Sequence, residues 1–378
     1  QEVETAAKAA AMLMEHTAKI DVTLPLEQVK QKLGLHLTKR QSRGVEVAME
    51  RNLSIITGGP GTGKTTVLKA IIEVYRILHP KNRIVLAAPT GKASRRMAQS
   101  TGMLEALTLH SLLGLQGDFC SKDKQDQPLP VDFLIVDEAS MVDMWLAHQL
   151  FTRLQKDTKL LLLGDVDQLE SVGAGNVLRD ILDSGAIPSV RLTEIFRQDE
   201  KSMIVYNAHR INRGEAPRLN AKGSDFFFER AVSPSDAAKR IVALCASRLP
   251  SFLHLDPVRQ MQVLSPTKKG ECGVWMLNQL LQAEFNPAAP GKHERVRGDT
   301  TFREGDKVMQ TRNNYQLKWQ KEGVFGAEEG QGVFNGDIGF IVSIDPQEHV
   351  MSVQFDDERV AEYEGADVDD LELAYCIS

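Results

Sequence analysis

Residues 53–78 read LSIITGGPGTGKTTVLKAIIEVYRIL, and this stretch decides the fold of the chain. A short apolar run leads into the glycine-rich segment GGPGTGKTT at residues 58–66, and apolar residues at helical spacing follow it. The segment fits the phosphate-loop pattern GxxxxGK[ST] between a strand and a helix, which is the context that the pattern requires. A glycine-rich turn without a ligand is the simpler alternative. The intact flanking pattern favours the phosphate loop.

Each residue type in this segment has a chemical reason. Glycines let backbone N–H groups turn inward around phosphates, and the N-terminus of the following helix adds a favourable dipole. Lys64 can reach the outer phosphates, and the Thr65 hydroxyl can ligate Mg²⁺. The sequence therefore predicts a nucleotide-phosphate site formed by Gly58, Gly59, Pro60, Gly61, Thr62, Gly63, Lys64, Thr65 and Thr66.

Four short apolar runs, each followed by a turn and a helical pattern, indicate the fold class. They are LSIIT, RIVLAA, DFLIV and KLLLLG, within residues 53–164. Continuous apolar runs that alternate with helices indicate parallel strands buried on both faces, so we expect a doubly wound α/β sheet. Residues 1–50 have helical spacing and are expected to form an added helical segment.

The rest of the chain has a different pattern of apolar and polar residues. Another α/β segment is expected to begin at RQMQVLSPTKKG, near residue 259. After about residue 300, short runs of strand composition such as GDIGFIVSID and HVMSVQFDD indicate a small antiparallel barrel. Residues 120–130 are charged, rich in proline and without periodicity, so a projecting hairpin or loop is expected there.

An acidic pair ends the strand pattern DFLIVDEAS. Asp137 can hold Mg²⁺, and Glu138 can polarise an attacking water. Taken alone, the acidic pair is weak evidence for a catalytic site, because acidic turns after strands are common. It is favoured here because a phosphate loop precedes it in the same predicted parallel sheet.

The next apolar strand reads LLLLGDVDQLESVGAGN, residues 160–176. Ligands of such sheets bind at the carboxyl ends of the strands, so Gln168 is expected near the terminal phosphate or the attacking water. The alternative is that Gln168 only caps a turn. Arg197 in RLTEIFRQ could neutralise charge that develops during phosphoryl transfer, although a surface salt bridge fits the residues equally well.

Three segments suggest contacts with nucleic acid. In APTGKASRRMA, Pro89, Thr90, Gly91 and Lys92 could grip a sugar-phosphate backbone, whereas Arg95 and Arg96 fit a solvated helix better. His110 and Ser111 in TLHSLLG, and Thr267, Lys268 and Lys269 in SPTKKG, are similar candidates. A lone histidine or lysine pair is normally structural or solvated.

Composition restricts the class of protein only broadly. The chain has 378 residues, 42% hydrophobic content and a net charge of −6, which decides little because a folded enzyme needs only a local basic groove. The four cysteines are scattered and suggest free thiols in a reducing compartment. No apolar run spans a bilayer and no leader pattern starts the sequence, so a cytoplasmic location without membrane contact is the expectation.

The ordered motifs GGPGTGKTT, APTGKAS, TLHSLLG, LIVDEASMVD, LLGDVDQLESVGAGNVL and LTEIFRQ together resemble the RecD-type branch of superfamily 1 DNA helicases. The resemblance continues through NAHRINRG, VLSPTKKGECGVWMLN, FREGDKVMQTRNNY and FNGDIGFI, and it covers about residues 35–378. It implies two RecA-like P-loop domains with ATP and Mg²⁺ between them, and an SH3-like all-β insertion. It also implies movement from 5′ to 3′ along single-stranded DNA.

The resemblance assigns roles and boundaries. Gln41 matches the glutamine that reads the adenine, Thr65 and Asp137 match the metal-binding residues, and the matching catalytic set is Lys64, Asp137, Glu138, Gln168 and Arg197. We expect a helical segment at 1–34, a first RecA-like domain at 35–215 with a strand-separating hairpin at about 112–131, and an incomplete second domain at 216–378 with the SH3-like barrel at about 335–365.

The sequence departs from the family at its end. The family's second domain continues with further motifs, including a final arginine that faces ATP, whereas this chain stops at LELAYCIS. We therefore expect a truncated chain that binds ATP but hydrolyses it and unwinds DNA poorly.

The leading functional hypothesis is an ATP-dependent DNA helicase or translocase in DNA repair and recombination. It would act on single-stranded DNA and DNA junctions, with nuclease or helicase subunits as candidate partners. The alternative is an ATP-gated DNA-binding or assembly subunit of a nuclease complex with little motor activity. A kinase lacks support, because no acceptor-binding lid is evident in the sequence.

Overall fold

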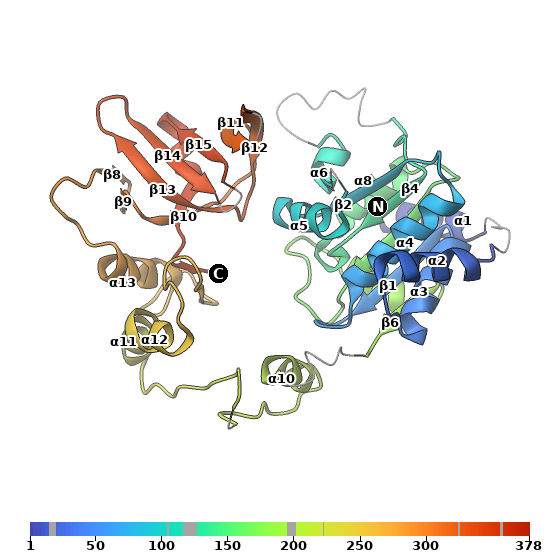
Figure 1. The fold of residues 1–378 in the computed structure, drawn as a ribbon, viewed down its shortest axis with the longest axis horizontal. Helices are drawn as coiled ribbons and strands as arrows, with labels where there is room; N and C mark the ends of the chain where they lie inside the picture. The colour runs from blue at the N-terminus through green and yellow to red at the C-terminus, as the bar shows by residue number, and fades with distance from the viewer. Residues whose placement is uncertain are drawn as a thin grey trace. The chain divides into compact units, whose positions relative to one another are not determined.

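The computed structural model describes residues 1–14, 20–103, 106–115, 127–194, 202–221, 223–323, 326–355 and 358–378. The chain divides into two compact units, Gln1–Phe228 and Glu229–Ser378 (Figure 1). Most of the predicted strand-separating hairpin, residues 116–126, and the predicted catalytic Arg197 lie outside the described residues.

A six-stranded parallel sheet forms the centre of the first unit. Its order is β3-β2-β4-β5-β1-β6, and every pair of neighbours is parallel. The strands are β1 (Leu53–Gly58), β2 (Ile84–Ala88), β3 (Leu107–Thr108), β4 (Phe133–Val136), β5 (Lys159–Gly164) and β6 (Ser189–Leu192). The parallel sheet expected from the apolar runs is therefore confirmed.

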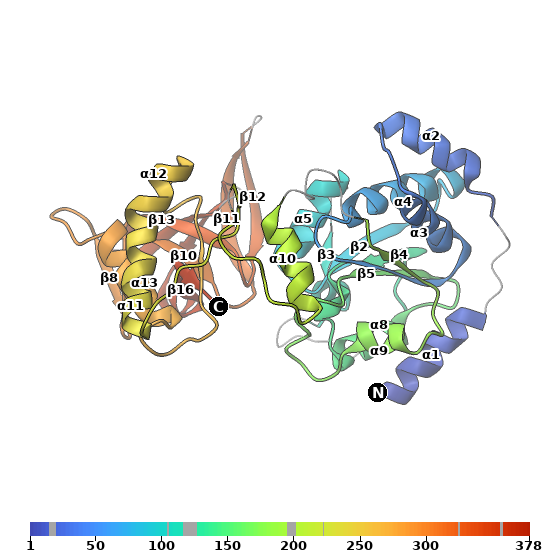
Figure 2. The same ribbon diagram turned by 90° about the horizontal axis from the view of Figure 1, so that it is seen from below.

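Helices cover both faces of this sheet (Figure 2). One face carries α1 (Glu2–Met14), α8 (Met144–Arg153) and α9 (Val177–Asp183), and the other carries α2 (Thr23–Leu33), α3 (Lys39–Glu50), α4 (Lys64–Leu78) and α5 (Gly91–Thr101). Strand β5 shows why its sequence is uniformly apolar. Leu160 and Leu162 enter the first core, whereas Leu161 and Leu163 enter the second, because successive side chains point to opposite faces.

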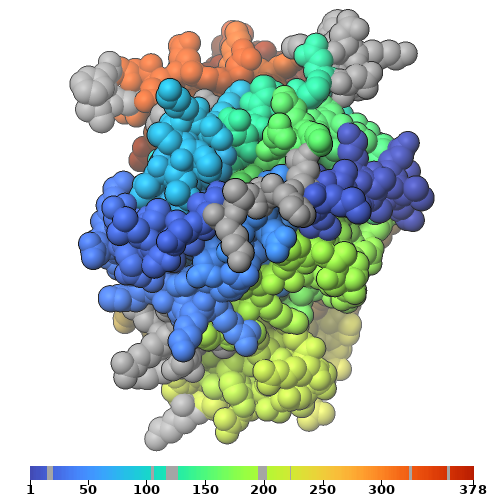
Figure 3. Space-filling view, turned by 90° about the vertical axis from the view of Figure 1, so that its right-hand side faces the viewer, coloured from blue at the N-terminus to red at the C-terminus, as the bar shows by residue number. Residues whose placement is uncertain are grey.

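Shorter elements complete the first unit. They are α6 (Leu109–Leu112), the 3₁₀ turn η1 (Ala139–Met141) and α10 (Met203–Asn212). The N-terminal helices, drawn in blue, form part of the surface of this unit beside its green segments (Figure 3). Residues after the predicted boundary at 215 still belong to this unit, and Arg218 and Asp225 bond to α10.

The second unit combines helices with a larger antiparallel sheet. Its helical elements are α11 (Pro234–Ala243), the π-helical turn η2 (Leu244–Arg248), α12 (Leu249–Leu253) and α13 (Val274–Phe285). Strand β7 (Val263–Leu264) pairs in parallel with β17 (Cys376–Ile377), and β8 (Glu294–Arg297) forms a hairpin with β9 (Thr300–Arg303).

The antiparallel sheet has the order β12-β11-β15-β14-β13-β10-β16. Its strands are β10 (Lys307–Gln310), β11 (Asn314–Gly323), β12 (Gly326–Val333), β13 (Ile338–Asp345), β14 (Val350–Phe355), β15 (Val360–Tyr363) and β16 (Leu371–Leu373), with the 3₁₀ turn η3 (Gly365–Asp370) before the last. The all-β region thus extends to both sides of the predicted barrel at 335–365.

A buried carboxylate ties α13 to this sheet. Asp306 is 0% exposed and accepts hydrogen bonds from Gln282 Nε2 (2.6 Å), Asn286 Nδ2 (2.7 Å) and the Tyr375 hydroxyl (3.0 Å). Burial raises the pKa of Asp306, and these donors oppose the rise. The network joins segments that are far apart in the sequence.

Two further predictions concern the cysteines and membrane-spanning helices. Cys245, Cys272 and Cys376 are free thiols, as expected, and Cys120 lies outside the described residues. Within the part of the chain that the structure describes, no helix combines the length and apolar character needed to cross a membrane.

Candidate functional site

The phosphate-loop segment lies between β1 and α4, as predicted. Gly61 (φ 73°) and Gly63 (φ 79°) adopt the left-handed conformation that glycine tolerates best, and α4 begins at Lys64. The ammonium group of Lys64 donates hydrogen bonds to the carbonyl oxygens of Gly58 and Gly59. Residues 58–66 therefore form a closed backbone loop at a helix N-terminus, the geometry that binds phosphate.

Three predicted site segments follow strands that are neighbours in the sheet. Strand β5 is paired with β4 on one side and with β1 on the other. Because all three strands are parallel, their carboxyl ends share one edge of the sheet. The phosphate loop after β1, Asp137 and Glu138 after β4, and Gln168 after β5 therefore lie at the same edge.

The two carboxylates have perturbed acidities. Burial raises the pKa of Asp137, while the backbone N–H of Glu138 and the charges of Lys64 and Arg96 oppose the rise. Burial also raises the pKa of Glu138, and the charges of Asp137 and Asp165 add to the rise. Glu138 has φ 52°, a conformation that costs about 1–3 kcal/mol for such residues and concentrates at functional sites.

Gln168 lies on the exposed turn that follows β5. Its Nε2 donates to Asp165 Oδ2 at 3.3 Å, and its backbone N–H donates to the Asp165 carbonyl oxygen at 3.2 Å. Asp165 is only 2% exposed and fixes the turn to the end of the strand. The turn-capping role and the predicted phosphate-sensing role are thus compatible, because the amide stays at the edge that carries the phosphate loop.

Gln41 is fastened to the phosphate loop. The side chain is 2% exposed, its Oε1 accepts from the Thr38 N–H at 2.9 Å, and its Nε2 donates to the Thr62 carbonyl oxygen at 3.1 Å. The Thr38 hydroxyl accepts in turn from the Gln41 N–H, which completes a capping box at the start of α3. Adenine recognition by Gln41 stays a prediction.

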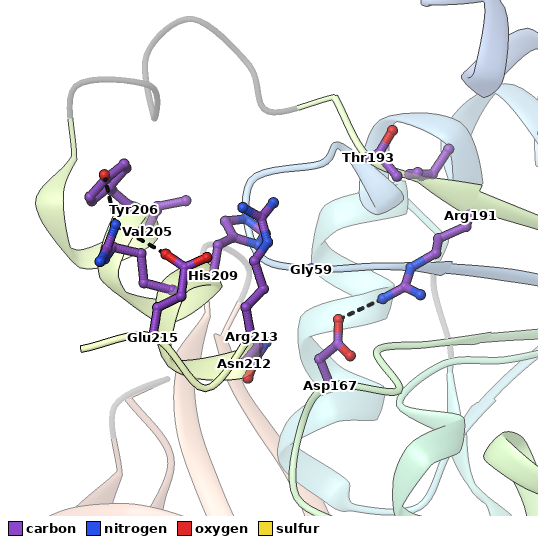
Figure 4. A pocket seen from close by; sticks show the side chains of 12 residues that line it. Gly59, Asp167, Arg191, Thr193, Val205, Tyr206, His209, Asn212, Arg213 and Glu215 are labelled. Atoms are coloured by element: carbon purple, nitrogen blue, oxygen red, sulfur yellow. Dashed lines mark hydrogen bonds and ion pairs between the residues drawn. The ribbon is translucent and has the colours of Figure 1, made fainter. Parts of the chain in front are cut away.

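A cavity of about 620 Å³ adjoins the phosphate loop within the first unit (Figure 4). Gly59, Asp167 and Arg191 line it from the sheet edge, and His209, Arg210 and Arg213 line it from α10. Arg191 Nη2 forms an ion pair with Asp167 Oδ2 at 2.9 Å. Three arginines against two acids make its lining positive, which suits an anionic ligand.

The residues predicted to hold Mg²⁺ are suitable for that ion. Thr65 is exposed in the first turn of α4, and Asp137 follows β4 at the same edge of the sheet. A cation beside Asp137 would favour the ionised form that burial disfavours. Among the described residues no three His, Cys, Asp or Glu side chains gather as a metal site, and Mg²⁺ usually takes one or two carboxylates with substrate phosphates.

The structure brings two of the predicted DNA-binding segments together. Residues 89–92 follow β2 and residues 110–111 follow β3, and these strands are parallel neighbours. The Thr90 hydroxyl accepts from the Ala93 N–H at 3.2 Å and caps α5, whereas Lys92 is exposed. Burial lowers the pKa of His110. Lys92 is therefore the side chain of this pair of segments that is freest to meet a phosphate.

The third segment, residues 267–269, lies in the second unit. Its carbonyl oxygens at Thr267 and Lys268 accept from the N–H groups of Val274 (2.9 Å) and Trp275 (3.2 Å). The Lys269 ammonium lies 5.7 Å from the centre of the Trp275 ring. A basic turn is thus held beside an exposed aromatic ring at the start of α13.

Sequence reasoning missed two residues of the site. Arg96 is exposed on α5, as a solvated helix face requires, and its charge also opposes the rise in the pKa of Asp137 and Glu138. Its spacing of four from Lys92 on α5 was an available signal. His209 lies within NAHRINRG, and nothing in the local pattern indicates that it lines the cavity.

Known families match most of the chain. Residues 36–226 match the AAA domain family, and residues 277–355 match the family described as the ATP-dependent RecD-like DNA helicase SH3 domain. The chain is similar to the ATP-dependent RecD2 DNA helicase of Deinococcus radiodurans, with 33% identity over 342 residues, 90% of this chain and 43% of that protein. It is 29% identical to the RecBCD enzyme subunit RecD of Mycobacterium tuberculosis over 340 residues, 80% of this chain and 55% of that protein.

The chain therefore spans about half the length of the curated relatives that it matches. Its fold is similar to that of a Pif1 helicase from Candida albicans, with a TM-score of 0.52 and 19% identity over 91% of this chain and 85% of that one. A Pif1 helicase from Bacteroides in complex with ADP-AlF3 and ssDNA gives a TM-score of 0.51 and 19% identity, over 91% and 83% of the two chains. At this identity the likeness concerns the fold alone.

Proposed function

We propose that this chain, which belongs to the RecD-like family of DNA helicases, binds ATP, hydrolyses it poorly by itself and contributes to ATP-driven movement on DNA. One observation carries the proposal. The phosphate loop, the Asp137–Glu138 pair and Gln168 follow three parallel strands that are neighbours in the sheet, so they share one edge of it. Such an edge can hold a nucleotide triphosphate, a metal ion and an attacking water together.

The residues of the chain divide the chemistry. Lys64 reaches the outer phosphates, and Thr65 and Asp137 would hold Mg²⁺, which when bound neutralises charge on the phosphates. Glu138 accepts a proton from the attacking water, a role that its raised pKa suits because the base must bind that proton. Gln168 orients the water or the terminal phosphate from the neighbouring strand end.

Single-stranded DNA is the proposed track. Lys92 stands at the same sheet edge as the carboxylates, and Lys268 and Lys269 stand beside an exposed tryptophan, an arrangement suited to phosphates and stacked bases. Movement from 5′ to 3′, action at DNA junctions and a role in repair or recombination are proposed from the resemblance to RecD-type helicases.

A second candidate function has a specific observation in its favour. Several relatives carry the name RecBCD enzyme subunit RecD, so a chain of this kind can be part of a multisubunit enzyme. We propose as the alternative an ATP-gated DNA-binding or assembly subunit of a nuclease complex. The two functions differ in whether ATP turnover accompanies the change in DNA affinity.

The test is a titration of fluorescently labelled single-stranded DNA at several salt concentrations, with and without a non-hydrolysable ATP analogue, alongside an assay of phosphate release. A motor is expected to change its DNA affinity with the analogue and to release phosphate faster with DNA. Coupled affinity without turnover would favour the assembly subunit. No coupling between the two ligands would refute the motor. Lys64→Ala, which should not bind the nucleotide, is the control.

A further inference from the structure

Helix α10 touches the phosphate loop through His209. The imidazole Cε1 lies 3.1 Å, and Nε2 3.8 Å, from the position that a Cβ atom on Gly59 would occupy. These are two residues that the sequence separates widely. A Cβ atom at residue 59 would lie unusually close to the ring, which would have to shift by a few tenths of an ångström.

The Nε2 atom of His209 is buried, and within the described residues it has no hydrogen-bond partner. Buried polar atoms without partners are rare and costly, by about 1–3 kcal/mol, and each one requires an explanation. The ring lies on the wall of the positive cavity that adjoins the phosphate loop (Figure 4). A ligand oxygen that came within hydrogen-bond distance of this atom, beside the phosphate loop, would satisfy it.

Helix α10 is tied by hydrogen bonds to the segment that follows it. The Asp225 carboxylate accepts hydrogen bonds from the N–H groups of Met203 (2.6 Å) and Ile204 (3.2 Å) at the helix start. Asn207 is 0% exposed and exchanges hydrogen bonds with the backbone of Arg218, at 2.7 and 2.9 Å. Interactions at two levels of the helix therefore fix its orientation relative to the segment that follows.

The position of Lys64 indicates which part of a nucleotide the ring would meet. Its ammonium bonds the carbonyl oxygens of Gly58 and Gly59, and in phosphate loops this lysine reaches the outer phosphates. The stretch at residues 58–59 is thus the outer-phosphate side of the loop, and His209 rests on it. A histidine N–H can donate to a phosphate oxygen.

We propose that His209 Nε2 donates a hydrogen bond to the terminal phosphate of bound ATP, and so makes α10 a sensor that distinguishes ATP from ADP. This proposal rests on the proposed function, because it requires a nucleotide in the phosphate loop. It assigns a role in phosphate recognition to a helix outside the phosphate loop and the acidic motif.

The test measures the Kd of the 378-residue chain for a fluorescent, non-hydrolysable ATP analogue and for the matching ADP. His209→Ala is expected to weaken the ATP analogue about tenfold, the value for a lost hydrogen bond to a charged group, and to change ADP binding less than about twofold. His209→Gln places an amide where Nε2 stood and should restore most of the difference. His209→Asn mimics Nδ1 instead and should not.

Either of two results would overturn the proposed His209 contact while leaving the proposed function intact. They are unchanged binding of the ATP analogue by His209→Ala, or an equal loss of affinity for both nucleotides. If His209→Ala does not fold, the comparison between His209→Gln and His209→Asn decides, and equal affinities for the ATP analogue would count against the proposal. Failure of the unmodified chain to bind either nucleotide would instead overturn the proposed function, and this contact with it.

Discussion

Gln41 Nε2 donates a hydrogen bond to the carbonyl oxygen of Thr62 at 3.1 Å, and this bond joins helix α3 to the phosphate loop. Both groups are buried, so the bond is shielded from water. A residue that the family resemblance assigns to adenine therefore also has a structural task. The position of the loop depends on a helix that precedes the first strand.

Gln41→Glu should separate these tasks. Glutamate keeps the oxygen that accepts from Thr38 but loses the donor to Thr62, which leaves a buried carbonyl facing a carboxylate. We expect a loss of about 1–3 kcal/mol in the free energy of unfolding and weaker binding of ATP and GTP alike. Chemical denaturation and nucleotide titration measure both effects. Weaker binding of ATP alone, at unchanged stability, would show that adenine recognition dominates.

Glu138→Gln should remove the proposed base and retain the shape of the turn. We expect the rate of ATP hydrolysis to fall about 10²–10⁴-fold, the usual contribution of a general base, with nucleotide affinity nearly unchanged. Single-turnover hydrolysis and equilibrium binding are the measurements. Asp157→Asn, in the exposed turn that precedes β5 at the opposite end of that strand, serves as a control for the removal of a carboxylate. Hydrolysis at the unmodified rate in Glu138→Gln would exclude the residue as the base.

The pH dependence of hydrolysis should report the raised pKa of Glu138. The base acts when ionised, so the rate is expected to decrease as the pH falls through the pKa of its carboxyl group. Burial first, and then the charges of Asp137 and Asp165, place this pKa above the ordinary glutamate value of 4.5. A profile of kcat/KM against pH, which reports the free enzyme, should therefore show an acid limb centred above 4.5. A limb at or below that value, or an equal limb in Glu138→Gln, would contradict this assignment.

Lys159 should make the free energy of unfolding depend on pH in the alkaline range. Its side chain is 7% exposed, donates to the carbonyl oxygens of Met49 (2.8 Å) and Arg51 (2.9 Å), and has a pKa lowered by burial from 10.5 to about 8. Between these values the unfolded chain binds more protons than the folded chain. The free energy of unfolding should then rise with pH, by at most about 1.4 kcal/mol per unit.

Lys159→Met is the matched variant for this prediction, because it fills the space without a titrating group. Denaturant unfolding of both chains from pH 7.5 to 10.5 would show the rise only with the lysine. Parallel curves for the two chains would mean that Lys159 stays charged throughout, held by its two carbonyl acceptors.

Asp306→Asn should destabilise the second unit. An asparagine turns one of the two acceptor oxygens into a donor, which then faces donors from Gln282, Asn286 or Tyr375. We expect a loss of about 3 kcal/mol in the free energy of unfolding, typical of a broken buried network. Glu362→Gln, exposed on β15, removes a charge from the same unit and should change stability by less than about 0.5 kcal/mol. Similar losses in the two variants would show that the network is unimportant.

Much of the first unit could be predicted from local pattern. The apolar runs identified the strands because strands covered on both faces need apolar side chains in both directions, as Leu160 and Leu161 show. The phosphate loop was recognisable because its glycines and lysine are consecutive. Antiparallel strands were expected after about residue 300, but the predicted barrel limits of 335–365 leave out β11 and β12, which carry many polar and exposed residues and lack the alternation that marks a strand.

The sequence by itself determined the parallel α/β architecture, the phosphate loop and the acidic strand end, because each depends on neighbours along the chain. Only the tertiary structure decided that β5 lies between β4 and β1, that Gln41 bonds to Thr62 and that His209 rests on Gly59. These relationships join residues far apart in sequence. They are set by strand order and by how helices pack on the sheet, and no local periodicity encodes either.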